Sequence, residues 1–434
     1  MSLDYIYSDA NQPLRMVVWD LGRRCNFDCT YCTGWMHSTT SPMKKFEEYK
    51  RTADFIDEYY NIYKDKHKGD WKINISFTGG EPSVNPAFYQ LLPYLKEKYP
   101  YMRPTLTTNG TWGRRKGQFL LDHCHAIRVS YHAEGTAKQK ELIRENLLFI
   151  REAIGDQTWK LKVNVMMHVD YFDECVDLIE NFLKPNDIAY IPRTIGDDGR
   201  YRDQWFKDMD GQMRRTSHTY SPEQQDYIKN HWKTQNTNAS DARNKTDNTL
   251  SDDKKENTPP LIKLDKTDET GHINKMGRMC CGGRCMTVKK GNDVDDAMFI
   301  EQSNFKGWNC MINWFFLHIE EDRDAVYQHQ TCMAKLPGTP AVKLDIEKFG
   351  DIASKFTDEV GPICTLSESK KYLDWLRTQF EDGKTPTMVC PKTHCGCGIC
   401  VAKAKYDDDF EMIANKFIDF NTGEKDEASS RMPR

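Results

Sequence analysis

The stretch RMVVWDLGRRCNFDCTYC, residues 15–32, decides how the first half of the chain folds. It joins an apolar, β-branched run (15–21) directly to three cysteines, Cys25, Cys29 and Cys32. A short apolar run bounded by glycine and polar residues is typical of a buried strand. The three thiols are therefore expected on a loop at the carboxyl end of that strand.

The same pattern continues as far as residue 195, where short strand-like runs alternate with longer amphipathic ones. The predicted strands are 15–21, 72–78, 104–108, 126–132, 160–168 and 187–193, and the predicted helices are 43–63, 87–99, 137–154 and 172–183. Strands that alternate with helices predict right-handed βαβ units and a parallel sheet, flat or curved into a part-barrel. Functional residues of such sheets lie in the loops beyond the carboxyl ends of the strands.

Composition argues against several classes of protein. The 61 basic and 65 acidic residues nearly balance, so no field strong enough to attract nucleic acid or an anionic membrane is expected. No apolar run approaches the length of a membrane span, and the first fifteen residues do not resemble a signal peptide. The cytoplasm is the expected location.

The chain has fifteen cysteines, and ten of them lie from Cys280 to Cys400, where nine form clusters and Cys364 stands apart. In a reducing compartment, clustered cysteines indicate metal ligands rather than disulfides. The polar stretch 234–260, whose only aliphatic residue larger than alanine is Leu250, separates this half from the first. We therefore predict an α/β unit over 1–200, a polar linker or insertion over 201–278 and a small cysteine-rich α+β domain over 279–434.

Two elements are predicted inside the cysteine-rich half. Residues 314–332 have the pattern of a hairpin with its turn near 321–324, and residues 367–382 have the pattern of a helix.

Three thiolates are one ligand short of what a four-iron cluster or a tetrahedral zinc ion requires. A site with one open position is the mark of a catalytic metal. The alternative is a zinc knuckle, in which His37, five residues past Cys32, supplies the fourth ligand.

Other predicted strand ends also carry glycine or polar residues. Gly79-Gly80-Glu81-Pro82 follows the second strand, Thr107 to Gly110 follow the third, Ser130 to His132 end the fourth, and Asn164 lies in the fifth. Glycines there let a ligand approach the backbone, and a carboxylate such as Glu81 suits an ammonium group. A zinc knuckle needs none of these features.

With the CX3CX2C triplet and the GGEP segment, the sequence resembles the radical S-adenosylmethionine (SAM) superfamily over roughly residues 15–195. The resemblance implies a partial (β/α)6 barrel and a [4Fe–4S] cluster whose open iron binds SAM. It also implies reductive cleavage of SAM to a 5′-deoxyadenosyl radical, which abstracts hydrogen from a substrate.

The resemblance also implies roles for single residues. Cys25, Cys29 and Cys32 would ligate the cluster, and the segment from Gly79 through Gly80 to Glu81 would bind the methionine part of SAM. Tyr31 would lie near the adenine, while Ser130 and Asn164 match positions that often touch the ribose or carboxylate. Tyr31 packing in the core and strand-end hydrogen bonds of Ser130 and Asn164 are the alternatives.

The second cysteine set supplies enough ligands for one or two further clusters. Its members are Cys280, Cys281, Cys285, Cys310, Cys332, Cys390, Cys395, Cys397 and Cys400. Their order around a hairpin resembles the SPASM or twitch extension of radical SAM enzymes, which implies auxiliary iron–sulfur clusters. The last group reads CX4CXCX2C rather than the SPASM pattern CX2CX5CX3C, and a zinc ribbon with the Cys397–Cys400 pair is the alternative.

The sequence therefore predicts a radical SAM oxidoreductase or maturase acting on a peptide or protein side chain. The alternatives are a radical SAM enzyme with a small-molecule or nucleotide-type substrate, and a zinc-binding module without chemistry. A reductant such as flavodoxin or ferredoxin is an expected partner, and a membrane or nucleic acid is not. No catalytic residue can be named from the sequence, although Arg193 is a candidate for the inner wall that contacts substrate.

Overall fold

The structure is a computed structural model, and it describes part of the chain. The described residues are 5–6, 15–32, 37–64, 72–195, 205–207, 213–215, 218–231, 288–289, 292–293, 305–329, 333–384, 386–391 and 403–417. Within these ranges, no helix has both the length and the apolar character that a membrane crossing requires.

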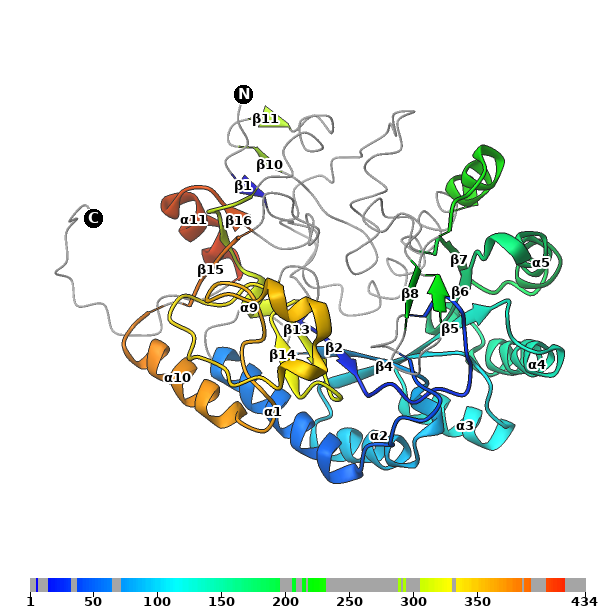
Figure 1. Ribbon diagram of the computed structural model, residues 1–434, viewed down its shortest axis with the longest axis horizontal. Helices are drawn as coiled ribbons and strands as arrows, with labels where there is room; N and C mark the ends of the chain where they lie inside the picture. The colour runs from blue at the N-terminus through cyan, green and yellow to red at the C-terminus, as the bar shows by residue number, and fades with distance from the viewer. Residues whose placement is uncertain are drawn as a thin grey trace, which may run out of the picture.

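An eight-stranded sheet forms the centre of the molecule, in the order β14-β13-β2-β3-β4-β5-β6-β7. Its first-half strands are β2 (Arg15–Asp20), β3 (Ile73–Thr78), β4 (Met102–Thr108), β5 (Ala126–His132), β6 (Leu161–Met166) and β7 (Tyr190–Arg193). Each of these pairs with the next in parallel. The six predicted strands and the parallel α/β architecture are confirmed, and the sheet curves as an arc (Figure 1).

Helices cover the outer face of this arc (Figure 1). They are α1 (Phe46–Lys64), α2 (Pro86–Lys98), α3 (Arg114–His123), α4 (Ala137–Ile154) and α5 (Phe172–Asp177), which runs on as a π-helical turn over Leu178–Leu183. The sequence prediction missed α3, which contains Gly117, a residue of low helix propensity. A Cβ at Gly117 would lie 2.7 Å from the Trp112 indole nitrogen, so close packing against that ring requires glycine here.

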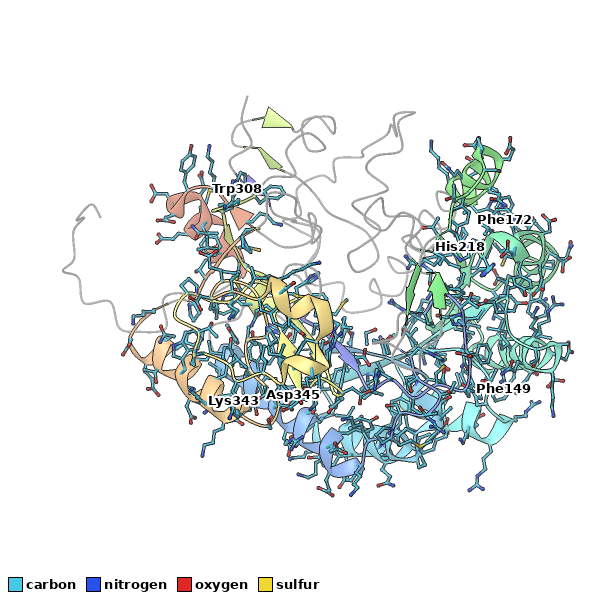
Figure 2. The ribbon with its side chains drawn as sticks, viewed as in Figure 1. Phe149, Phe172, His218, Trp308, Lys343 and Asp345 are labelled. Atoms are coloured by element: carbon cyan, nitrogen blue, oxygen red, sulfur yellow. The ribbon has the colours of Figure 1, made fainter. Side chains whose placement is uncertain are left out.

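The strands have two different faces. Along β3, Ile73, Ile75 and Phe77 are fully buried beneath the helices, whereas the alternate residues are only half-buried. The same alternation runs along β6, and side chains crowd the helical layer outside the sheet, where Phe149 of α4 lies toward α3 (Figure 2). The apolar core therefore lies on the convex side, and the concave side is partly open and polar.

The predicted hairpin is confirmed, and it is part of the main eight-stranded sheet. β13 (Phe316–Glu320) and β14 (Ala325–Tyr327) form an antiparallel pair, and β13 also pairs in parallel with β2. Residues 316–327 therefore extend the main sheet rather than standing apart in a cysteine-rich domain. The free edge of β2 offers unpaired backbone groups, and a second strand satisfies them.

Part of the predicted polar linker is packed against the barrel. Residues 222–231 are helical, and Tyr220 and Ile228 are buried. The Tyr220 hydroxyl donates to the Met167 carbonyl at 2.7 Å and accepts from the Ile195 amide at 2.8 Å. At least this part of 201–278 is therefore not a solvated linker. The polar stretch 234–260 lies outside the described residues.

A second, small antiparallel sheet contains β1 (Tyr5–Ile6), β16 (Lys403–Ala404), β12 (Asn309–Cys310) and β15 (Met388–Val389). It lies beside α11 (Asp407–Phe417), on the side of the molecule that Trp308 marks in Figure 2. Helix α10 (Ser369–Glu381) confirms the predicted helix and packs on α1. The mixture of short strands and helices agrees with the α+β character expected here, and the domain limits themselves stay predictions.

The remaining elements are short. They are β8 (Trp205–Lys207) paired with β9 (Met213–Arg215), β10 (Val288–Lys289) paired with β11 (Asn292–Asp293), α9 (Ile312–Phe315), and 3-10 turns at Pro82–Val84, Thr158–Lys160, Val169–Tyr171, Ile346–Lys348 and Gly350–Lys355.

Candidate functional site

The loop that follows β2 carries the cysteine triplet, as the sequence predicts. Its start continues the parallel pairing, since the Leu21 amide donates to the Thr78 carbonyl at 3.0 Å. Farther on, the Cys25 amide donates to the Ser38 carbonyl at 3.1 Å, so the loop is closed by its own return segment. Cys29 is buried, and Cys25 and Cys32 are half-buried. Backbone bonds therefore tie the described start of this loop to β3 and to residue Ser38.

The three thiols lie within electrostatic reach of one another. A hydrogen bond with Cys32, together with burial, raises the pKa of the Cys29 thiol far above its usual range. Burial raises the pKa of the Cys25 thiol to about 12, with smaller contributions from the charges of Glu81 and Cys32. Thiols crowded in this way ionise when metal cations compensate their charge. The donor set therefore fits a cluster of cationic irons.

The described ranges contain no group of three His, Cys, Asp or Glu side chains placed to hold one metal ion together. A four-iron cluster makes a different demand, because each thiolate binds a separate iron. The proposed fourth ligand of the zinc alternative, His37, is engaged elsewhere: its Nε2 atom hydrogen-bonds the Phe27 carbonyl, and the ring is buried. This arrangement favours the cluster over the zinc knuckle.

Gly79 and Gly80 join the loop after β3 to the cysteine loop. The Gly80 amide donates to the Gly22 carbonyl at 2.7 Å, and the Glu81 amide donates to the Arg24 carbonyl at 2.8 Å. A Cβ at Gly80 would lie 2.2 Å from the Arg24 carbonyl oxygen, and one at Gly79, whose φ is +112°, would lie 2.3 Å from an Asp20 carboxylate oxygen. Both glycines are needed for contact between two protein loops, a role the sequence did not reveal.

The Glu81 carboxylate is buried and accepts three hydrogen bonds from the protein. Its Oε1 atom accepts from the Ser83 amide at 3.0 Å and from the Thr108 hydroxyl at 2.7 Å, and its Oε2 atom accepts from the Asn109 amide at 2.6 Å. Burial raises the pKa of Glu81, and these bonds oppose the rise. The carboxylate therefore ties the loop after β3 to the end of β4, and its predicted contact with the SAM amino group stays a prediction.

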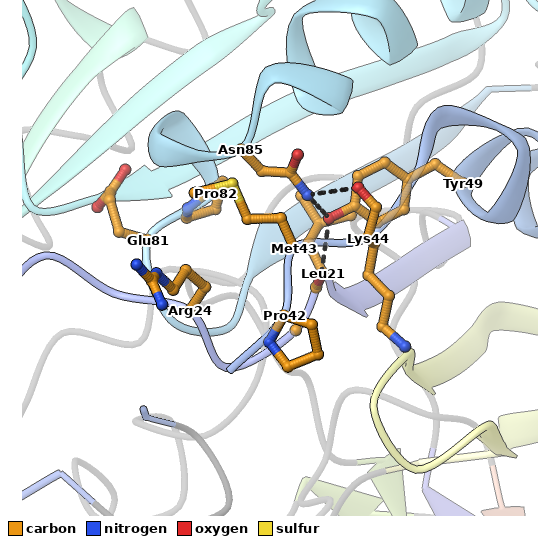
Figure 3. Close-up of a pocket in the computed structure, with 10 residues that line it drawn as sticks. Leu21, Arg24, Pro42, Met43, Lys44, Tyr49, Glu81, Pro82 and Asn85 are labelled. Carbon is orange, nitrogen blue, oxygen red and sulfur yellow. Dashed lines mark hydrogen bonds between the residues drawn. The ribbon is translucent and has the colours of Figure 1, made fainter. Parts of the chain in front are cut away.

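A second set of hydrogen bonds joins the residue that follows the GGEP segment and its 3-10 turn, Asn85, to α1 and the segment before it (Figure 3). The Asn85 side-chain amide donates to the Tyr49 hydroxyl at 2.9 Å and to the Lys44 carbonyl at 3.0 Å. The Tyr49 hydroxyl in turn donates to the Leu21 carbonyl at 2.7 Å. Helix α1 thereby fixes both the start of α2 and the start of the cysteine loop.

Tyr31 lies among histidines from the neighbouring strand ends. Its hydroxyl is 2.5 Å from His132 Nδ1, and its ring lies 5.9 Å from those of His132 and His168 and 6.2 Å from that of His218. Burial lowers the pKa of His132 to about 4, so this imidazole is neutral near pH 7. The predicted adenine contact of Tyr31 stays a prediction, and its hydrogen bond was not foreseen.

Glu134, also missed from the sequence, holds the middle of the cysteine loop. Its carboxylate accepts from the Thr30 amide at 2.9 Å and from the Thr30 hydroxyl at 2.6 Å. Ser130 and His132 on β5 and Glu134 just beyond it stand at alternate positions, and this period of two was the available signal.

Ser130 and Asn164 are brought together as predicted from their strand-end positions. They are register partners on β5 and β6, and both are half-buried. Asn164 Oδ1 also accepts from Arg193 Nε at 3.3 Å, which brings the candidate inner-wall residue to the same face. Their contacts with a cofactor remain predictions.

Of the second cysteine set, Cys310 and Cys390 are described and buried. Cys310 on β12 is opposite Met388 on β15, and the Cys390 amide donates to the Trp308 carbonyl at 2.9 Å. This register places both cysteines on one face of the small sheet. The other predicted ligands, Cys280, Cys281, Cys285, Cys332, Cys395, Cys397 and Cys400, lie outside the described residues.

Residues 19–168 match the family model of the radical SAM superfamily. The chain carries a radical SAM domain. The match spans β2 to β6 and includes the cysteine triplet and the GGEP segment. Radical SAM proteins are enzymes that use a [4Fe–4S] cluster and SAM, and the thiol arrangement of this chain fits that cluster. The predicted superfamily, the α/β fold, the [4Fe–4S] cluster and SAM are therefore confirmed, and the SPASM-like extension with its auxiliary clusters stays a prediction.

Curated relatives resemble part of the chain. A GTP 3′,8-cyclase of Staphylococcus carnosus is 27% identical over 196 residues, which are 42% of this chain and 54% of that protein. An AdoMet-dependent heme synthase of Oleidesulfovibrio alaskensis is 24% identical over 140 residues, which are 32% of this chain and 33% of that protein. The chain thus spans about half the length of the cyclase and about a third of the length of the heme synthase.

Solved structures also resemble the chain at low identity. The anSMEcpe structure with bound AdoMet covers 93% of this chain and 97% of its own at 14% identity, with a TM-score of 0.39. Streptococcus suis SuiB covers 80% of this chain and 67% of its own at 11% identity, also with a TM-score of 0.39.

Proposed function

We propose that this radical SAM enzyme abstracts hydrogen from a peptide or protein side chain, as a maturase or oxidoreductase. The observation that carries the proposal is the convergence of three buried or half-buried thiols on the loop after β2, whose backbone is hydrogen-bonded to the GGEP segment. The chemistry supplied by the bound cofactors is reductive cleavage of SAM and hydrogen abstraction by the resulting 5′-deoxyadenosyl radical.

The chain's own residues divide this task. Cys25, Cys29 and Cys32 would hold the cluster, and the backbone from Gly79 to Glu81, with Ser130 and Asn164 across the concave face, would hold SAM. Tyr31 would lie beside the adenine, and the Thr30–Glu134 bonds keep the loop in place. Half-buried side chains on the concave face would contact the substrate.

The peptide substrate is inferred from the second half of the chain. Cys310 and Cys390 share one face of the small sheet, as ligands of one auxiliary cluster would, and the cysteine order resembles a SPASM extension. An auxiliary cluster there would accept the electron left after hydrogen abstraction or position the substrate. A reductant such as flavodoxin or ferredoxin would supply the first electron.

A small-molecule or nucleotide-type substrate is the second candidate. The similarity to a GTP 3′,8-cyclase, 27% over 196 residues, supports it.

The deciding experiment measures 5′-deoxyadenosine formed from SAM by the anaerobically reconstituted, reduced protein. We expect product from the wild type and from Cys124→Ala, whose thiol is buried near the opposite end of the sheet, and none from Cys25/Cys29/Cys32→Ala. Zinc in place of iron, with no SAM cleavage, would refute the proposal. Deuterium transfer from labelled peptides or nucleotides into 5′-deoxyadenosine then separates the two substrate classes.

A further inference from the structure

The concave face of the sheet is polar in a way that parallel sheets usually are not. Parallel strands are normally covered on both faces and read as continuous apolar runs. Here the second-half strands of the parallel array alternate, with Ile127, Val129 and Tyr131 buried toward the helices and Arg128 exposed between them. An exposed arginine inside a strand of an eight-stranded sheet indicates that solvent or a ligand reaches this face.

The strand register gathers cations on this face. Arg128 on β5 is the direct partner of Lys162 on β6, and both lie at concave positions. Arg193 on β7 is the partner of Met166 and is held by the Asn164 side chain at 3.3 Å. Arg128 and Lys162 therefore lie at one depth, and Arg193 lies four residues nearer the strand ends, at the level of Met166 and His132.

No carboxylate lies at the concave positions of β5, β6 or β7, which carry, besides these cations, Ala126, Ser130, His132, Asn164, Met166 and Ile191. The concave carboxylates Asp20 and Glu320 are on β2 and β13, at the opposite side of the sheet. Glu320 is paired there with Arg323 at 3.0 Å. The charges on the concave face are thus separated, with the positive side under β5 to β7.

We propose that Arg128 and Lys162, which are direct register partners, bind an anionic group of the substrate, a carboxylate or a phosphate, and that Arg193 lies above it, nearer the strand ends. Guanidinium groups suit both because their donors match two acceptor oxygens at once, and lysine adds a compact charge. Each of the three cations also interacts with other parts of the chain, so the anion joins contacts that already exist.

The register also sets where the anion lies relative to the reacting carbon. Arg128 precedes His132, the last residue of β5, by four residues, which at about 3.3 Å per residue is roughly 13 Å along the strand. Lys162 lies at the same depth. The substrate therefore places its anionic group roughly 13 Å below the end of β5 and its reacting C–H bond near the strand ends. Calling the ligand a substrate rests on the proposed function.

The test measures binding of two probe anions, inorganic pyrophosphate and glutarate, to the full-length reconstituted protein by calorimetry. We expect at least one probe to bind the wild type and to bind Arg128→Gln/Lys162→Gln at least tenfold more weakly. The charge-conserving variant Arg128→Lys/Lys162→Arg should stay within about threefold of the wild type, which excludes misfolding as the cause. Arg115→Gln removes an exposed cation on α3 and should change nothing.

The two probes separate the two sources of negative charge. Binding of pyrophosphate alone indicates a phosphate-bearing substrate, and binding of glutarate alone indicates a carboxylate, such as an acidic peptide side chain. The proposal is overturned if neither probe binds, or if the Gln double variant binds as the wild type does. The binding measurement needs no reductant and no SAM cleavage. A wild type that binds a probe but forms no 5′-deoxyadenosine in the separate assay of the reduced protein would therefore refute the proposed function and leave the anion site intact.

Discussion

Replacing Glu81 tests whether this residue acts through the protein or through SAM. Its carboxylate accepts hydrogen bonds from Ser83, Thr108 and Asn109, and all three donors belong to residues that are themselves buried. In Glu81→Ala these donors lose their acceptor. At the lower limit of about 1 kcal/mol for each unsatisfied donor, the free energy of unfolding should fall by about 3 kcal/mol.

The free energy of unfolding of the conservative variant Glu81→Gln should lie between those of the wild type and Glu81→Ala. Its carboxamide oxygen can still accept from the two donors that share Oε1, but its NH2 group would face the Asn109 amide, which is also a donor. A loss of about 1–2 kcal/mol is expected. The order wild type, Gln, Ala in stability follows from the hydrogen bonds alone.

The assay is urea unfolding of the apoprotein under anaerobic conditions, followed by tryptophan fluorescence, with SAM binding measured separately on reconstituted protein. Glu97→Ala removes an exposed acid on α2 and should leave both quantities unchanged. A Glu81→Ala apoprotein within about 0.5 kcal/mol of the wild type, combined with lost SAM affinity, would refute the positioning role and support a direct contact with SAM.

Three further outcomes are expected. Burial raises the pKa of Glu321 to about 7, so folding takes up a proton, and the free energy of unfolding should fall by about 3 kcal/mol from pH 4.5 to 7. Glu321→Gln keeps an acceptor for Trp19 and should flatten the dependence of this free energy on pH, measured by urea unfolding. An unchanged pH dependence would contradict the prediction. Glu134→Ala removes both bonds to Thr30, worth about 2 kcal/mol together, and should speed iron release to a chelator roughly thirtyfold. Equal release rates would show that these bonds do not support the loop. Gly80→Ala places a Cβ 2.2 Å from the Arg24 carbonyl oxygen, so it should lower the free energy of unfolding by about 3 kcal/mol or more and should also lower iron incorporation. Full iron incorporation would show that the GGEP loop and the cysteine loop can separate.

Local sequence was sufficient for the elements and for the cysteine loop. The alternation in residues 72–78 and 126–132 predicted strands because one face of each is buried under helices and the other is not. Cys25, Cys29 and Cys32 could be placed at a strand end because they follow residues 15–20 along the chain without an intervening element. These features depend on neighbours in sequence, so the sequence alone determined them.

Only the tertiary structure decided which distant segments meet. β13 joins the edge of β2 although about 300 residues separate them, as the Trp19–Glu321 bond with a separation of 302 residues illustrates. The hydrogen bonds of Glu81 come from β4, and the cations Arg128 and Lys162 become neighbours through strand register. No local pattern contains these contacts, because burial and backbone pairing are satisfied across the whole sheet. The sequence by itself determined the chemistry of the cysteine loop, and the fold decided what holds that loop and what lies beneath it.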